Sequence, residues 1–211
     1  MRKFSLTDNF LIEIDRAVNT LSGKVNGRAQ TPGEDLQDEE LDQKARVKSG
    51  RLLRVNHCGE ICAQALYRGQ RLSSKNQKTK DFMEEAASEE IKHLGWCEKR
   101  LNELGTKPSI FNPLFYATSF LTGVLVGMKT DKFSLGFTAE TERQVMVHLN
   151  KHISSLPKKD RKSKAILEQM RLDEENHKDS AIEKGGEALP RGAKYLMTLL
   201  SKVMTKTTYW V

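Results

Sequence analysis

Few of the 211 residues are cysteine, proline, glycine or aromatic, and each shortage excludes a class of protein. With 14 glycines and 5 prolines, the chain has few turn residues for a sandwich or barrel of many strands, whereas its many Lys, Glu, Leu and Ala residues favour helices. Three cysteines, none in a CxxC motif, cannot form a complete set of disulfides, so we expect a reducing, intracellular compartment. Hydrophobic residues make up 37% and charged residues 30%, which excludes a polytopic membrane protein.

The net positive charge alone does not identify a partner, and the positions of the basic residues must decide between the possibilities. A net charge of +7 suits a protein that binds nucleic acid or an anionic membrane, and it also suits simple solubility. The basic residues form no recognised nucleic-acid motif, so we expect no nucleic-acid partner. Near the N-terminus, Asp8, Glu13 and Asp15 interrupt the apolar stretch that a signal peptide needs.

Apolar residues recur at helical spacing in six stretches, of which the first is residues 8–21 with Thr7 or Asp8 as the N-cap. Residues 22–50 hold Gly, Pro and mixed charges without an apolar period, which predicts a linker. The later helices are expected at 51–72, 80–104, 138–156, 160–184 and 192–207. The chain thus divides into an N-terminal helix (1–21), the linker, a helical bundle (51–190) and a basic amphipathic C-terminal helix (191–211).

One segment inside the bundle region, Pro108–Met128, has no charged residue. A helix that spans a membrane needs about 20 apolar residues. Asn112-Pro113 and two glycines interrupt this one and leave only 15 residues, Leu114–Met128. We therefore expect a buried or interfacial hairpin within residues 108–137.

Two Glu-x-x-His motifs, Glu90–His93 and Glu174–His177, combine with two single glutamates, Glu60 and Glu142. Positions three apart share a helix face, so each motif directs a carboxylate and an imidazole into one volume. The single glutamates stand on apolar stripes and precede their motifs by 30 and 32 residues, and the two halves are offset by 82 and 84. This spacing indicates a duplicated helix pair.

Four carboxylates and two imidazoles in a helical bundle are the ligand set of ferritin-like di-iron and di-manganese proteins. Such donors suit iron or manganese, and the absence of well-spaced cysteines argues against a structural zinc site. The alternative, ordinary solvated glutamates, conflicts with their apolar faces, where unpaired carboxylates would repel one another. We expect an all-α, ferritin-like four-helix bundle built from a duplicated helix pair, with the added apolar hairpin and the C-terminal amphipathic helix.

Other polar residues near these motifs have weaker signals. Glu89 and Asp173 each lie four residues before a motif histidine, and a metal-bound imidazole commonly donates its outer N–H to a carboxylate. They are therefore either hydrogen-bond partners of the imidazoles or ordinary surface acids. The remaining candidates are His57 as a polar support beside Glu60, His148 and His152 as surface or outer groups, Cys58 and Cys62 as small core residues, and Glu85, Glu140 and Glu175 as solvated or interfacial acids.

In this order, the motifs resemble those of the demethoxyubiquinone hydroxylase family. The matching stretches are 54–60 (RVNHCGE), 65–70 (ALYRGQ), 89–94 (EEIKHL), the Glu142 helix with 148–150 (HLN), and 173–177 (DEENH). The resemblance covers about residues 5–210 and is least in the linker. It departs from the family at Leu149, where tyrosine is frequent, and at Arg143 and Gln144, where a second acid is common. Neither departure removes a ligand.

The resemblance implies a di-iron monooxygenase that hydroxylates a polyprenylated methoxy-methyl-benzoquinol with O₂ in ubiquinone biosynthesis. Carried over residue by residue, it implies two Fe ions per chain, with Glu90 and Glu174 bridging them. The ligands that it implies are Glu60, Glu90 and His93 for one ion and Glu142, Glu174 and His177 for the other. It implies no catalytic residue beyond these.

Two alternatives stay open: a ferritin-like iron-oxidising protein, and a non-catalytic protein that binds quinone or membrane. The uncharged segment favours the hydroxylase, because a polyprenyl substrate needs an apolar route from the bilayer. The C-terminal helix, with Lys194, Lys202 and Lys206, suits either an anionic membrane surface or a cover for the bundle. We expect a peripheral protein on the cytoplasmic face of the bacterial inner membrane; a homo-oligomer and contacts with other ubiquinone-biosynthesis proteins stay open.

Overall fold

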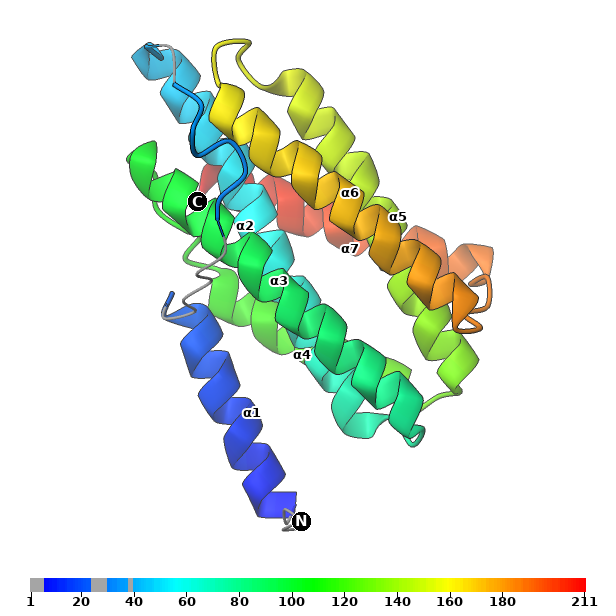
Figure 1. The fold of residues 1–211 in the computed structure, drawn as a ribbon. Coiled ribbons are helices and arrows are strands. Elements are labelled where there is room, and N and C mark those ends of the chain that lie inside the picture. Colours follow the sequence, from blue (N-terminus) through cyan, green and yellow to red (C-terminus); the bar gives the residue numbers. More distant parts are fainter. Residues whose placement is uncertain (1–5, 24–29, 38–39) are drawn as a thin grey trace.

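The structure is a computed structural model that describes residues 6–23, 30–37 and 40–211, and these described residues form helices and loops without a strand. The helices are α1 (Leu6–Leu21), α2 (Gln43–Ser73), α3 (Gln77–Glu103), α4 (Asn112–Gly127), α5 (Asp131–Ser155), α6 (Arg161–Glu183) and α7 (Arg191–Trp210). Figure 1 shows α2, α3, α5 and α6 as long, roughly aligned rods. The all-α fold expected from the sequence is confirmed.

The bundle consists of two tightly packed pairs, α2 with α3 and α5 with α6. One core cluster joins Leu53, Cys97 and Leu149 to Ile166 and Met170, and so connects all four helices. A second cluster around Tyr67, Met83 and Ala181 fills the other end. Polar residues on the same inward stripes therefore lie between two apolar layers, which is where the metal motifs are placed.

Three further helices surround the bundle. Helix α4 packs along α2, α7 packs against α2 and α5, and α1 contacts α2 and α4. In Figure 1, α4 and α7 lie behind α3 and α6, which face the viewer. No helix in the described ranges is long and apolar enough to cross a membrane.

The expected starts of α2 and α5, at residues 51 and 138, are wrong by about two helical turns, and other expected boundaries by less. Helix α2 begins at Gln43 and not at residue 51, because Asp42 caps it by accepting a hydrogen bond from the Ala45 N–H at 2.7 Å. Thr7 and Asp8 lie inside α1, which begins at Leu6, and residues 1–5 of the expected N-terminal segment lie outside the described residues. The linker is correspondingly shorter than 22–50, and its residues 24–29 and 38–39 lie outside the described part.

The expected apolar hairpin is wrong: residues 112–127 form one helix, α4, and α5 already begins at Asp131. Pro113 was interpreted as an interruption, but it lies in the first turn of α4, where a missing N–H costs little. The two glycines do not break the helix either. They lie on its buried face and let it approach α2.

This close approach makes Gly123 sensitive to a single methyl group. A Cβ there would lie 2.1 Å from the carbonyl oxygen of Leu66, and a Cβ at Gly69 would lie 2.3 Å from that of Phe120. We expect Gly123→Ala to destabilise the protein by about 1–3 kcal/mol, because two backbones must separate. Urea unfolding measures the difference.

The matched control is Gly59→Ala, in the interior of α2, where a Cβ would meet nothing within 4 Å. It should leave stability unchanged or raise it by about 0.5–1 kcal/mol through helix propensity. Equal destabilisation by both substitutions would contradict close α2–α4 packing as the cause.

Candidate metal centre

The six residues of the two duplicated motifs come together in the middle of the bundle. Glu60 lies on α2, Glu90 and His93 on α3, Glu142 on α5, and Glu174 and His177 on α6. All six are buried, with exposed fractions between 0% for Glu90 and 6% for His177. The Glu-x-x-His spacing places each carboxylate and its histidine on one face, and both faces point into the same space.

The donor atoms form two groups that share two carboxylates. Glu60, Glu90, His93 and Glu174 make one group, and Glu90, Glu142, Glu174 and His177 make the other, each with its ligand atoms within 4.8 Å of one another. The oxygens of Glu90 lie 3.1 Å from Nδ1 of His93 and 3.4 Å from Nδ1 of His177. Those of Glu174 lie 3.3 and 3.2 Å from the same two nitrogens. Each shared carboxylate thus directs one oxygen to each group.

The electrostatics of this cluster fit a cation. Three of its carboxylate oxygens, one each on Glu60, Glu90 and Glu142, are buried and make no well-formed hydrogen bond. Those of Glu60 and Glu90 have only a long contact with a histidine Nδ1, at 3.5 and 3.4 Å. Burial, with repulsion from neighbouring carboxylates, raises the pKa of Glu60 and of Glu142 well above the usual range. Buried carboxylates of this kind are stabilised when a cation lies among them. The donor set, all oxygen and imidazole nitrogen, fits a metal site.

The imidazoles carry the compensating charge in the protein alone. Burial lowers the pKa of His177, but the nearby carboxylates of Glu174 and Glu90 outweigh it and raise that pKa to about 12. The pKa of His93 is raised well above its usual value by Asp173, Glu174 and its other carboxylate partners, which outweigh burial. Metal ligation requires an unprotonated ring nitrogen, so a bound cation would take the place of these protons.

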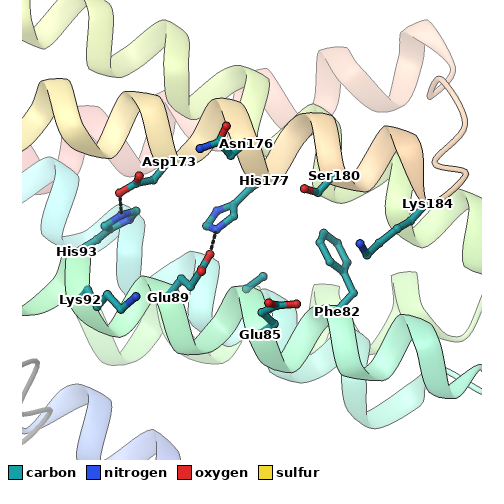
Figure 2. A pocket seen from close by; sticks show the side chains of 11 residues that line it. Phe82, Glu85, Glu89, Lys92, His93, Asp173, Asn176, His177, Ser180 and Lys184 are labelled. Carbon is teal, nitrogen blue, oxygen red and sulfur yellow. Dashed lines mark hydrogen bonds and ion pairs between the residues drawn. The ribbon is translucent and has the colours of Figure 1, made fainter. Parts of the chain in front are cut away.

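Glu89 and Asp173 do contact the histidines, but each contacts the histidine of the other helix (Figure 2). Asp173 on α6 lies 3.0 Å from Nε2 of His93 on α3, and Glu89 on α3 contacts Nε2 of His177 on α6. Both acids therefore contact a motif histidine, although not the one four residues later in the sequence. The sequence spacing identified these residues. It could not show that each acid pairs with the histidine of the opposite helix, because this pairing depends on how α3 faces α6.

The remaining histidines lie apart from the cluster. The Nδ2 amide of Asn112 lies 3.5 Å from Nδ1 of His57, and burial lowers the pKa of His57 to about 4. The imidazole of His148 is 2.9 Å from Ser201 Oγ on α7, and that of His152 is 3.0 Å from the Asn56 side-chain oxygen. The side-chain partner of His57 is thus Asn112 on α4, and its expected role as a polar support beside Glu60 stays a prediction.

Among the other candidates, Glu140 is interfacial and not solvated, which is one of the two alternatives expected for it. It is buried, accepts hydrogen bonds from Arg143 and Gln144, and pairs with Lys194 of α7 at 3.6 Å. Its charge is therefore part of how α7 docks. Glu175 pairs with Arg171, and Cys58 and Cys62 are free thiols on the inner part of α2.

A polar cavity of about 340 Å³ lies between α3 and α6, directly outside the two histidines (Figure 2). Its walls include Glu85, Glu89 and Asp173 together with the polar side chains of Asn176 and Ser180. Sequence reasoning missed this cavity, because its lining residues beyond the motif histidines, Glu89 and Asp173 follow no motif, and their proximity depends on the gap between the two helix pairs.

Comparison with known proteins places this geometry in a family context. Residues 47–208 match the family model described as "Ubiquinone biosynthesis protein COQ7". A relative from Azotobacter vinelandii is 51% identical over 99% of this chain and 97% of its own length, and one from Pseudomonas putida is 49% identical over the same shares. A third, from a Marinomonas species, is 50% identical over 97% of this chain and 98% of its own length. All three are named 3-demethoxyubiquinol 3-hydroxylase.

A solved structure supports the fold independently. A dodecameric thioferritin, the bacterioferritin-related protein of Bacteroides fragilis, superposes with a TM-score of 0.54 over 80% of this chain and 91% of its own. At 18% identity this likeness shows the ferritin-like fold alone. It agrees with the expected fold class.

Proposed function

The chain belongs to the COQ7 family of ubiquinone biosynthesis proteins, and from this premise we propose that it is a 3-demethoxyubiquinol 3-hydroxylase whose Glu/His cluster binds two iron ions. The substrates are then a polyprenylated demethoxyubiquinol and O₂, and the reaction is a monooxygenation. One observation carries the proposal: two buried donor groups share Glu90 and Glu174, so that each carboxylate faces both groups. A single ion could not use all four carboxylates.

The residues have separable tasks in this proposal. Glu60 and His93 would hold one ion, Glu142 and His177 the other, and the two shared glutamates would bridge. Bound there, two ferrous ions supply O₂ binding and two electrons, which is chemistry that side chains do not provide. Asp173 and Glu89 hold the outer nitrogens of the imidazoles, so that Nδ1 of each ring points into the cluster. The apolar layers at both ends exclude water.

We further propose that the protein lies on the cytoplasmic face of the bacterial inner membrane as a peripheral protein. Helix α4 exposes Leu114, Leu121 and Leu125 at 58–66%, and α7 exposes a second apolar row. That row consists of Leu196, Leu199, Leu200 and Val203. Lys202 and Lys206 are exposed beside it and suit anionic headgroups, whereas Lys194 is paired with Glu140. Large exposed apolar surface of this kind marks an interaction site.

Anaerobic reconstitution tests the proposed reaction. We expect two ferrous ions per chain by metal analysis and, after admission of air with a short-chain demethoxyubiquinol, up to one hydroxylated product per chain. The balance is one quinol, one O₂, two electrons from the ferrous ions and two protons, giving the hydroxylated quinol and water. Oxidation of iron without product would favour the ferritin-like alternative. One ion per chain, or zinc alone, would contradict the di-iron assignment.

A further inference from the structure

The cavity between α3 and α6 opens on the side of the bundle that the apolar helices leave uncovered. Helix α4 packs on α2, and α7 packs on α2 and α5, so both lie away from the α3–α6 face (Figure 1). The cluster therefore has an apolar side and a polar side. A hydrophilic species that moves from water to the buried carboxylates therefore meets polar side chains along this cavity and apolar helices on the other side.

The inner end of the cavity is formed by the outer edges of the two imidazoles (Figure 2). Their Nε2 atoms contact Asp173 and Glu89 in the cavity wall, while their Nδ1 atoms face the buried glutamates. The rings thus lie between the cavity and the buried carboxylate oxygens of the cluster. Carboxylate, amide and hydroxyl oxygens along the wall are groups that a hydrated divalent cation prefers.

The two rings are held unequally. Asp173, the partner of His93, also accepts a hydrogen bond from Gln169 at 2.9 Å, and the ring of His93 lies 5.2 Å from that of Trp96. His177 is held at Nε2 by Glu89, whose side chain is 44% exposed and makes no other hydrogen bond or ion pair within the described ranges. Rotation of the His177 ring out of its position therefore breaks fewer contacts outside the cluster than rotation of the His93 ring.

We propose that this cavity is the entry port through which a divalent cation reaches the Glu/His cluster. The side chains of His177 and its partner Glu89 would move aside to admit the cation. The inference rests on the proposed metal-binding function and adds the route of loading to it. Two lysines, Lys92 and Lys184, also line the cavity, and Lys92 lies near Glu89 (Figure 2). Lys184 places its ammonium over the Phe82 ring at 5.1 Å, at the end of the cavity away from His93. Ser180, one turn after His177 on α6, lines the cavity beside this histidine.

The test changes the charge at Ser180 and measures loading of the full-length apo-protein with Co²⁺, whose ligand-field absorption reports coordination. We expect Ser180→Asp to raise the association rate constant and Ser180→Lys to lower it, each roughly tenfold at low salt, as Coulomb's law gives for a divalent ion at about 6 Å in water. At about 1 M salt both effects should largely disappear, because the Debye length falls to about 3 Å. The matched controls, Lys178→Gln and Asp179→Asn, change the net charge equally outside the cavity lining and should load at the wild-type rate.

A second experiment tests the role of His177 and Glu89 by measuring how fast a chelator extracts bound Co²⁺. Glu89→Ala should speed extraction more than Asp173→Ala, because His93 keeps its contact with Trp96. Equal acceleration would overturn the role of His177. Unchanged loading in both Ser180 variants, with two ions still bound at saturation, would overturn the port and leave the proposed function intact. Unchanged loading with a raised KM for quinol would assign the cavity to the substrate headgroup, whereas failure to bind any ion would overturn port and function together.

Discussion

Replacing Glu174 with alanine is expected to abolish quinol hydroxylation and to lower the iron content below two ions per chain. Glu174 directs one oxygen to each donor group, so its loss removes a ligand from both proposed ions at once. Even outer partners of metal ligands are worth about 10–100-fold in affinity or activity, so we expect an activity loss of more than about 100-fold. Glu90→Ala should behave alike, because Glu90 spans the same two groups. Single-turnover product analysis and metal analysis measure both effects.

Two controls separate ligand loss from misfolding. Glu174→Gln keeps the volume of the side chain and removes its charge, so its circular dichroism should match that of the wild type while iron is lost. Glu175→Ala removes the neighbouring acid, which is half-buried and pairs with Arg171 on the outer face of α6, and it should retain two ions. Quinol hydroxylation at the wild-type level in Glu174→Ala would refute the bridging role.

The motifs could be recognised from the sequence because their chemistry depends on local spacing. Glu-x-x-His fixes two donors on one helix face whatever the partner helix does, and the duplication brings the second set. The six residues that the motifs select do come together in the structure. The crossing of Asp173 to His93 and of Glu89 to His177 could not be derived, because it depends on the spacing and rotation of α3 against α6.

The misjudged elements share a different cause. The interpretation of 108–137 as a hairpin gave Pro113, Gly123 and Gly127 their usual meaning as helix breakers. In the structure Pro113 starts α4, and both glycines allow contact between the backbones of α4 and α2. Similarly, residues 43–50 lack an apolar period, yet they extend α2 because Asp42 caps them. Tertiary contact and capping decide such segments, and neither is visible as periodicity.

The second large effect is expected on the exposed face of α4. Leu114, Leu121 and Leu125 are 58%, 61% and 66% exposed, and their spacing of seven and four residues places them on one side of the helix. Changing all three to glutamine should weaken binding to liposomes and lower the hydroxylation of a long-tailed quinol at least tenfold. Each buried CH₂ is worth about 0.8 kcal/mol, so a polyprenyl tail cannot leave the bilayer cheaply and the enzyme must come to it. Vesicle flotation and turnover in liposomes measure the loss.

The three leucines are better targets than Phe120, because Phe120 packs on the core cluster around Ile61 and stacks on Tyr116. A water-soluble quinol without a tail should keep most of its turnover in the triple variant, since the iron ligands are untouched. The matched control places glutamine at Leu172 and Ile182, which are 46% and 52% exposed on α6. Removing apolar surface there should leave liposome binding unchanged, because α6 lies on the polar side of the bundle. Equal loss with the tailed and the tail-less quinol would show that α4 supports the bundle and not delivery from the membrane.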